Sequence, residues 1–220
     1  MLKAARRFRP DVVVVLGDYV DFNAVSSHPK DLRRTRFVAE ELEDAATGLD
    51  ELDGLGAHAR IYIGGNHDRR LAVYIAARAP ELFGIHTVEG ALELKRRGWQ
   101  YVPYGEAFKL GQLRITHDIG YTGKYALHQS QADFGTSLVI GHSHRLALIG
   151  VGTAEGETLI AASFGWLGDA TKIDYLHSTK VSRDWMHGFG LGYIHRDGTV
   201  DIVPVPIRNG RCVIEGRVIR

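Results

Sequence analysis

Cysteine is almost absent from this sequence, since Cys212 is the single one among 220 residues. A lone cysteine excludes an internal disulfide and a metal cluster held by thiolates within one chain. An excess of one charge is also missing, because 27 Lys and Arg residues stand against 26 Asp and Glu residues. No overall field would therefore draw in nucleic acid or an anionic membrane. The longest notable apolar run, Val12 to Leu16, is far shorter than the about 20 residues of a membrane span.

The basic N-terminal segment also lacks the apolar core of a signal peptide. We therefore expect a soluble, cytoplasmic protein without a membrane partner. Hydrophobic residues at 45% and charged residues at 24% are average for globular proteins, which excludes a disordered, fibrous or coiled-coil chain. The length suits one core and is short for two, so we predict a single domain over residues 1–220. Glycine, at 26 residues, and histidine, at 11, are the residues that stand out.

The first half alternates strand and helix patterns. Asp11 to Leu16 is a β-branched run typical of a buried parallel strand, and Asp31 to Leu55 has apolar residues near helical spacing. Glu155-Gly156, Asp197-Gly198 and Asn209-Gly210 in the second half suit tight hairpins. We predict an α/β fold with two stacked sheets and helices outside. The other expected elements are helices over Leu2 to Arg9, Arg69 to Ala79 and Ala91 to Arg97, and strands over Ala59 to Ile63, Leu113 to Ile115 and Leu138 to Ile140.

Four predicted strands end in polar residues that can bind a metal. In open α/β sheets, ligands bind beyond the carboxyl ends of strands. His142 and His144 would point the same way on an extended segment. Each motif alone has a plain alternative, such as a turn at Asp18 or ordinary partly buried histidines, and it is the ordered combination that favours a site. The mixed oxygen and nitrogen donors suit Mn²⁺, Fe, Co, Ni or Zn²⁺. The candidate ligands are Asp18, Asn66, His117, His142 and His144.

The order of these motifs resembles the calcineurin-like metallophosphoesterase family. The resemblance spans Asp11 to Arg145, and the hairpin-rich remainder is similar to the small phage and prokaryotic members. It implies a four-layer α/β/β/α sandwich and two metals bridged by Asp18. One metal would take Asp18, Asn66, His117 and His142, and the other would take Asp18 and His144. The motifs that carry the resemblance are Gly17-Asp18-Tyr19-Val20-Asp21, Gly65-Asn66-His67-Asp68, His117 and Gly141-His142-Ser143-His144.

The sequence departs from the family in lacking the N-terminal Asp-x-His motif that completes the second metal site. Only 17 residues precede Asp18. We therefore expect the first strand of the fold to be missing, the first metal site to be intact and the second to be weakened or empty. A missing strand would leave an apolar groove beside Val12 to Leu16, which a second copy of the chain could cover.

The resemblance also implies roles for the remaining motif residues. His67 would bind the substrate phosphate and assist the leaving oxygen, and Asp68 would position its ring. The alternative for His67 is a cap of the next helix. Asp21 would orient a neighbouring group or cap its turn. Arg145 lies on a segment that could reach the mouth of the site and is the candidate substrate-binding residue; the alternative is a solvated loop charge.

These roles predict a metal-dependent phosphodiesterase that acts on nucleic acid or cyclic nucleotides through metal-activated hydroxide. One or two divalent ions are expected, with Mn²⁺ preferred over Fe, Ni, Co and Zn. Two alternatives stay open. One is a phosphomonoesterase that acts on nucleotides or phosphoproteins, and the other is a catalytically weak scaffold of the same fold.

Overall fold

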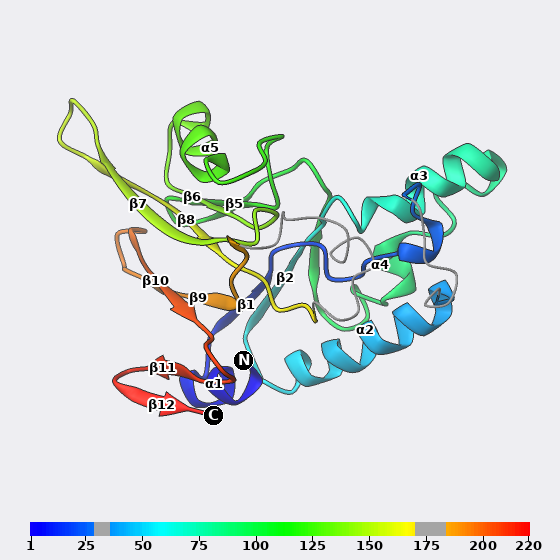
Figure 1. Cartoon of the computed structure of the whole chain (residues 1–220), viewed down its shortest axis with the longest axis horizontal. Coiled ribbons are helices and arrows are strands. Elements are labelled where there is room, and N and C mark those ends of the chain that lie inside the picture. The colour runs from blue at the N-terminus through cyan, green and yellow to red at the C-terminus, as the bar shows by residue number, and fades with distance from the viewer. Residues whose placement is uncertain (29–35, 170–183) are drawn as a thin grey trace. The chain divides into compact units, whose positions relative to one another are not determined.

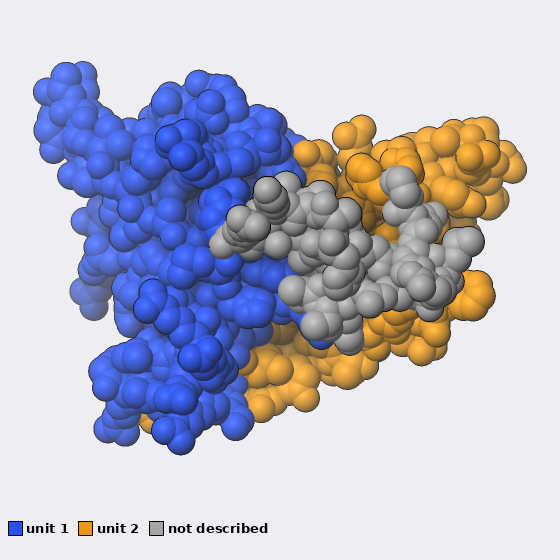
Figure 2. Space-filling model, in the orientation of Figure 1, with its two compact units in different colours: residues 1, 3, 105–220 blue, residues 2, 4–104 orange. Residues whose placement is uncertain are grey.

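The computed structural model describes residues 1–28, 36–169 and 184–220. The chain divides into two compact units, one made of residues 2 and 4–104 and one made of residues 1, 3 and 105–220 (Figure 2). Each unit contains at least one helix and its own sheet, so the predicted mixed α/β class with two main sheets is confirmed. Among the described residues, no helix is both long enough and apolar enough to cross a membrane.

The unit of residues 4–104 contains a three-stranded parallel sheet, in the order β1-β2-β3. Figure 1 labels β1 and β2 of this sheet. Long α2 packs on this unit's core, because Ala45, Leu49 and Leu52 recur at helical spacing and are buried. They contact a cluster that includes Phe22 and Tyr62. The elements are α1 (Leu2–Phe8), β1 (Val12–Val15), η1 (Asn23–Val25), α2 (Val38–Asp53), β2 (Ala59–Ile63), α3 (Arg69–Arg78), η2 (Pro80–Leu82), α4 (Val88–Ala91) and β3 (Gln100–Val102).

Two predicted helices differ from the structure. The helix expected from Asp31 begins at Val38, where the Glu40 carboxylate accepts a hydrogen bond from the backbone N–H of Phe37 at 2.7 Å. Residues 31–35 of the prediction lie outside the described residues. The helix predicted over Ala91 to Arg97 is wrong.

Helix α4 ends where that prediction began, and turns follow it. Its start is set by Thr87, whose hydroxyl accepts from the N–H of Gly90 at 3.0 Å. Glu93 then adopts a left-handed backbone with φ 53°, which a helix cannot continue through. The other elements predicted in the first 140 residues are confirmed to within one residue at each end.

A network at the end of α2 joins the helix to the sheet. The Asp53 carboxylate accepts hydrogen bonds from Trp99 Nε1 at 2.7 Å, Arg97 at 2.8 Å and Arg60 at 2.9 Å. Burial would raise the pKa of Asp53, but the hydrogen bonds from Trp99 and the two arginines outweigh burial and lower the pKa. The ionised carboxylate therefore stabilises the fold.

We expect Asp53→Ala to destabilise the protein by about 2–4 kcal/mol, because three donors lose a partly buried partner. Since the folded-state pKa of Asp53 lies below its unfolded value of about 3.9, this stabilisation is complete above about pH 4. It is lost as the pH falls from there through the folded-state pKa. Urea unfolding of both chains at pH 7 and pH 3 measures the difference, which should shrink at the lower pH.

Asp50→Ala is the matched control. The Asp50 carboxylate also pairs with Arg97, at 2.6 Å, but its side chain is 68% exposed. An exposed ion pair contributes at most about 1 kcal/mol. Equal destabilisation by the two variants would contradict the role assigned to Asp53.

The unit of residues 105–220 contains a five-stranded mixed sheet, in the order β4-β5-β6-β8-β7. Helix α5 packs on it through a cluster that includes Leu127, Leu138 and Ala161. The elements are β4 (Phe108–Leu110), β5 (Leu113–Thr116), α5 (Ala126–Phe134), β6 (Leu138–Ile140), β7 (Leu146–Gly152), β8 (Thr158–Phe164), β9 (Gly188–Ile194), β10 (Val200–Pro206), β11 (Cys212–Ile214) and β12 (Arg217–Ile219).

Two of the three hairpins expected in the second half join paired strands. Glu155-Gly156 lies between β7 and β8, and Asp197-Gly198 lies between β9 and β10. Asn209-Gly210 forms a tight turn closed by the antiparallel bridge of Arg208 and Arg211. Glu215-Gly216, which the sequence analysis did not single out, turns the chain between β11 and β12. The second half is not wholly antiparallel, because β8 pairs in parallel with β6.

Candidate metal centre

Asp18 lies in a turn that directly follows β1. Gly17 and Asp18 both have left-handed backbones, with φ 86° and 52°. One Asp18 carboxylate oxygen accepts from the backbone N–H of His67 at 2.8 Å, which ties this turn to the one after β2. Gly65 is required there, because a Cβ at this position would collide with the backbone nitrogen and carboxylate of Asp18.

Asp68 holds the same two turns together. Its buried carboxylate accepts from Gly65 N at 2.7 Å, from Tyr62 Oη at 2.9 Å and from Asp18 N at 3.0 Å. Burial raises the pKa of Asp68 to about 6, and the charge of Asp18 acts in the same direction against the hydrogen bonds. The Asp68 side chain is therefore a structural anchor for Asp18.

The role predicted for Asp68, positioning the His67 ring, is wrong. His67 Nδ1 instead lies 2.6 Å from Asp21 Oδ1. The same Asp21 oxygen accepts from Arg70 at 2.7 Å. Burial would raise the pKa of Asp21, but the hydrogen bond and charge of His67, together with Arg70, outweigh burial and lower the pKa. Asp68 cannot take this role because its carboxylate points to the backbone donors of the two turns.

His117 and His142 follow the carboxyl ends of β5 and β6. Their rings are in edge-to-face contact, with centroids 5.2 Å apart. The backbone N–H of Gly141 donates to the carbonyl of His117 at 2.9 Å, which fixes the two strand ends relative to each other. Buried Asp118 is a neighbour that the sequence analysis gave no role: its Oδ2 lies 3.9 Å from His142 Nδ1 and 4.0 Å from His117 Nε2.

The expectation that His142 and His144 lie on an extended segment is wrong. Both residues have left-handed backbones, with φ 45° and 54°, so the period-two rule for strands does not apply. The ring of His144 stacks on Trp166, with centroids 5.7 Å apart, and meets Trp185 edge-on at 4.1 Å. His144 thus contributes to a cluster of aromatic rings.

Asn66 and Arg145 are the remaining predicted site residues. Asn66 lies partly buried in the turn that follows β2, and its role as a metal ligand stays a prediction. The Arg145 guanidinium pairs with Asp184 through Nε and Nη2, both at 2.7 Å, and its Nη1 donates to the carbonyl of Ser143. The hydrogen bond from Arg145 lowers the pKa of Asp184. A role for Arg145 in substrate binding likewise stays a prediction.

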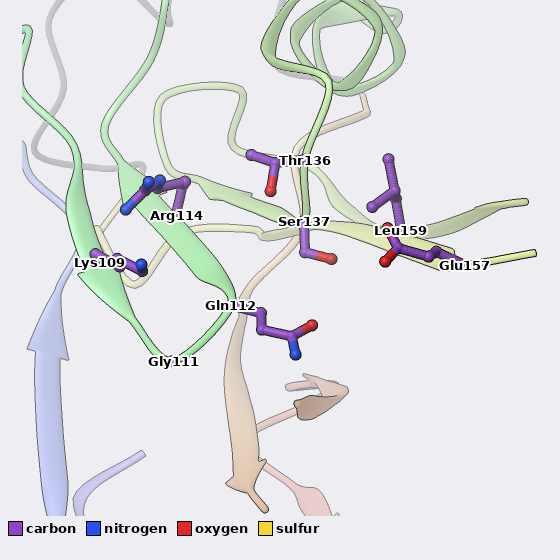
Figure 3. A pocket seen from close by; sticks show the side chains of 8 residues that line it. All are labelled: Lys109, Gly111, Gln112, Arg114, Thr136, Ser137, Glu157 and Leu159. Carbon is purple, nitrogen blue, oxygen red and sulfur yellow. The ribbon is translucent and has the colours of Figure 1, made fainter. Parts of the chain in front are cut away.

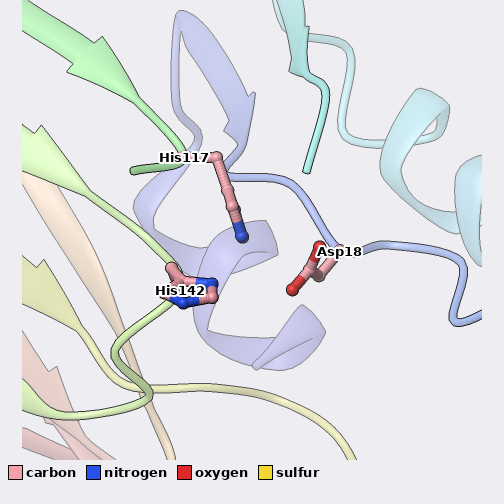
Figure 4. Close-up of side chains that lie close together, drawn as sticks. All are labelled: Asp18, His117 and His142. Carbon is pink, nitrogen blue, oxygen red and sulfur yellow. The ribbon is translucent and has the colours of Figure 1, made fainter. Parts of the chain in front are cut away.

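Three of the five predicted metal ligands form a group that could hold an ion. Asp18, His117 and His142 each offer one ligand atom, and these atoms lie within 4.8 Å of one another (Figure 4). Two ligands 2.1 Å from one ion are at most about 4.2 Å apart, so a small adjustment would suffice. One carboxylate and two imidazoles suit a divalent transition metal such as Mn²⁺ or Zn²⁺. The donor set therefore fits a metal ion and does not identify which one.

The chain is similar in sequence to two phage proteins. No family model matches the sequence. The "Gene 54 protein" of Mycobacterium phage L5 is 30% identical over 235 residues, which cover 96% of this chain and 87% of the phage protein. The "Gene 54 protein" of Mycobacterium phage D29 is 29% identical over 243 residues, with the same two coverages. These names state no activity, so the similarity alone assigns no function to this chain.

Proposed function

The chain belongs to the family of the mycobacteriophage Gene 54 proteins, and we propose that it is a metal-dependent phosphoesterase. The observation that carries the proposal is the group of Asp18, His117 and His142, whose donor atoms lie within 4.8 Å. Asp18 follows β1, and the two histidines follow β5 and β6. Asn66 would be the fourth ligand.

A divalent ion at these residues would activate water and neutralise charge on the phosphoryl oxygens. The chain's own contribution would centre on His67. Its Nε2 lies 3.9 Å from Asp18 Oδ2, and its Nδ1 is held by Asp21. The ring is thus fixed beside a proposed ligand, with Nε2 available for a phosphoryl or leaving oxygen. Arg70 forms an ion pair with Asp21, so the ring is positioned by Asp21 and, through it, by Arg70.

A second ion is less well supported than the first. It would need His144, which stacks against Trp166 and is not part of the group formed by Asp18, His117 and His142. We therefore propose one tightly bound ion, with Mn²⁺ as the first choice to test.

Phosphodiesters of nucleic acid or nucleotides are the proposed substrates. Trp166 and Trp185 are only partly buried and lie beside His144, the last residue of the metal motif. Partly exposed aromatic rings next to a phosphate-processing site favour substrates that carry bases, because bases stack on them. Phosphomonoester hydrolysis is the alternative within the same chemistry.

Hydrolysis of bis-p-nitrophenyl phosphate and p-nitrophenyl phosphate by the full chain tests the proposal. We expect release of p-nitrophenol from the diester with added Mn²⁺, a slower reaction with the monoester, and loss of both after chelation with EDTA. A faster monoester reaction would overturn the choice of diesters. Absence of both reactions at saturating Mn²⁺, from a folded chain that binds the metal, would overturn the proposed enzyme and favour a binding scaffold.

A further inference from the structure

A polar pocket of about 280 Å³ is lined by the residues that Figure 3 labels. It lies at the opposite end of the sheet from His117 and His142. Its rim comes from the β4–β5 turn and from residues that precede β6 and β8, whereas the two histidines follow the carboxyl ends of β5 and β6. The pocket therefore belongs entirely to one unit and is separate from the proposed metal centre. Its lining residues are Lys109, Gly111, Gln112, Arg114, Thr136, Ser137, Glu157 and Leu159.

Two cations face each other in this pocket. Lys109 and Arg114 are direct partners in the antiparallel pair of β4 and β5, so their side chains lie on the same face of the sheet. Like charges directly opposite each other destabilise a strand pair. Within residues 1–28, 36–169 and 184–220, neither cation forms an ion pair with a carboxylate. The strand pair thus keeps an unfavourable pair of positive charges that a bound anion would neutralise.

The neutral groups around the cations are hydrogen-bond donors. Ser137 Oγ accepts from the backbone N–H of Ile160 at 3.1 Å, which leaves its own O–H to donate. Thr136 adds a second hydroxyl, and Gln112 adds an amide. Glu157 is the one acidic lining residue, and Figure 3 shows it beside Leu159, across the pocket from the two cations.

We propose that this pocket binds a phosphate group. Arg114 would supply the planar fork of donors that matches phosphate oxygens, and Lys109 would supply a point charge. The hydroxyls of Thr136 and Ser137 would donate to the remaining oxygens. The group could belong to free phosphate or to a nucleic-acid backbone, which present the same oxygens to the pocket. This inference does not rest on the proposed phosphoesterase activity.

Titration calorimetry of the full chain with inorganic phosphate, in EDTA and at low salt, tests the site. We expect Arg114→Gln to weaken phosphate binding about tenfold or more, because a charge-assisted contact is lost. Arg217→Gln removes an equal charge from exposed β12 and should leave the affinity unchanged. Glu157→Gln removes the one carboxylate in the lining and should tighten binding. Absence of phosphate binding by the parent chain, or equal loss in the two arginine variants, would overturn the proposal.

Thermal unfolding separates a binding role from a structural one. Arg114→Gln should raise the midpoint of unfolding without phosphate, because the facing charges are relieved, and should lose the phosphate-induced rise that the parent chain shows. A variant that melts earlier than the parent without phosphate would contradict this account. A single-stranded oligonucleotide that binds through Arg114 more tightly than inorganic phosphate would identify nucleic acid as the source of the phosphate group, and weaker binding would identify free phosphate.

Discussion

A chain with alanine in place of His142 is expected to lose bound Mn²⁺ and phosphodiester hydrolysis together. The substitution removes one of two imidazoles from the proposed ligand group and leaves Asp18 and His117 as its members. Loss of a partner that only supports a ligand costs about 10–100-fold in metal affinity, so loss of a ligand itself should cost about 100-fold or more. Metal content after dialysis and Mn²⁺ titration measure the first effect, and the diester assay measures the second.

His86→Ala is the matched control, because His86 is an exposed histidine in the segment between η2 and α4. It should retain both metal and turnover. His117→Ala should behave as His142→Ala does, although His117 is almost fully buried and its loss also leaves a cavity. If the His142 variant kept one ion per chain at the parent affinity, the proposed metal centre would be wrong.

The elements that were predicted correctly are those that a pattern of neighbouring residues determines. The run Val12 to Leu16 is β-branched and followed by Gly17-Asp18, so both the strand and the polar turn after it could be read from neighbouring residues. The same holds for the strand Leu138 to Ile140, but not for the conformation of the motif that follows it. Helix ends were less predictable, since the start of α2 depends on whether Glu40 reaches back to cap Phe37.

Side-chain partners inside the candidate centre could not be read from spacing. Asp68 adjoins His67 in sequence, yet its carboxylate is taken by backbone donors from two separate turns. Asp21, which lies 46 positions before His67, holds the ring instead. Which carboxylate contacts the His67 ring depends on the three-dimensional positions of the competing donors, and the spacing of residues in the sequence does not give these positions.

The backbone conformation of His142 and His144 could not be predicted from the sequence either. A histidine seldom adopts a left-handed conformation, so two of them within Gly141 to His144 are not expected from composition. Tertiary contacts compensate for the strain: Ser143 and Ser163 are hydrogen-bonded at 2.7 Å, and the backbone N–H of Met186 donates to the carbonyl of His144 at 3.0 Å.

His67→Gln is expected to retain the metal but lose most of its turnover. The ring is the part of His67 that would meet the phosphoryl oxygens, and loss of a positioned proton donor costs about 10²–10⁴-fold in rate. The hydrogen bond from His67 to Asp18 is made by the backbone N–H, which glutamine also has. The proposed ligand should therefore keep its position. Turnover at saturating Mn²⁺, together with Mn²⁺ affinity, measures the two effects separately.

Variants of Asp21 test how the His67 ring is held. Asp21→Asn retains an oxygen that accepts from His67 Nδ1, whereas Asp21→Ala removes it. We expect alanine to lower turnover more than asparagine does, with Mn²⁺ affinity unchanged in both, because the carboxylate acts on the metal centre only through the ring. Loss of the metal along with turnover in His67→Gln would make His67 a structural residue. If His67→Gln kept the turnover of the parent chain, His67 would have no part in the proposed chemistry. The ion pair of Asp21 and Arg70 would then only stabilise the local fold.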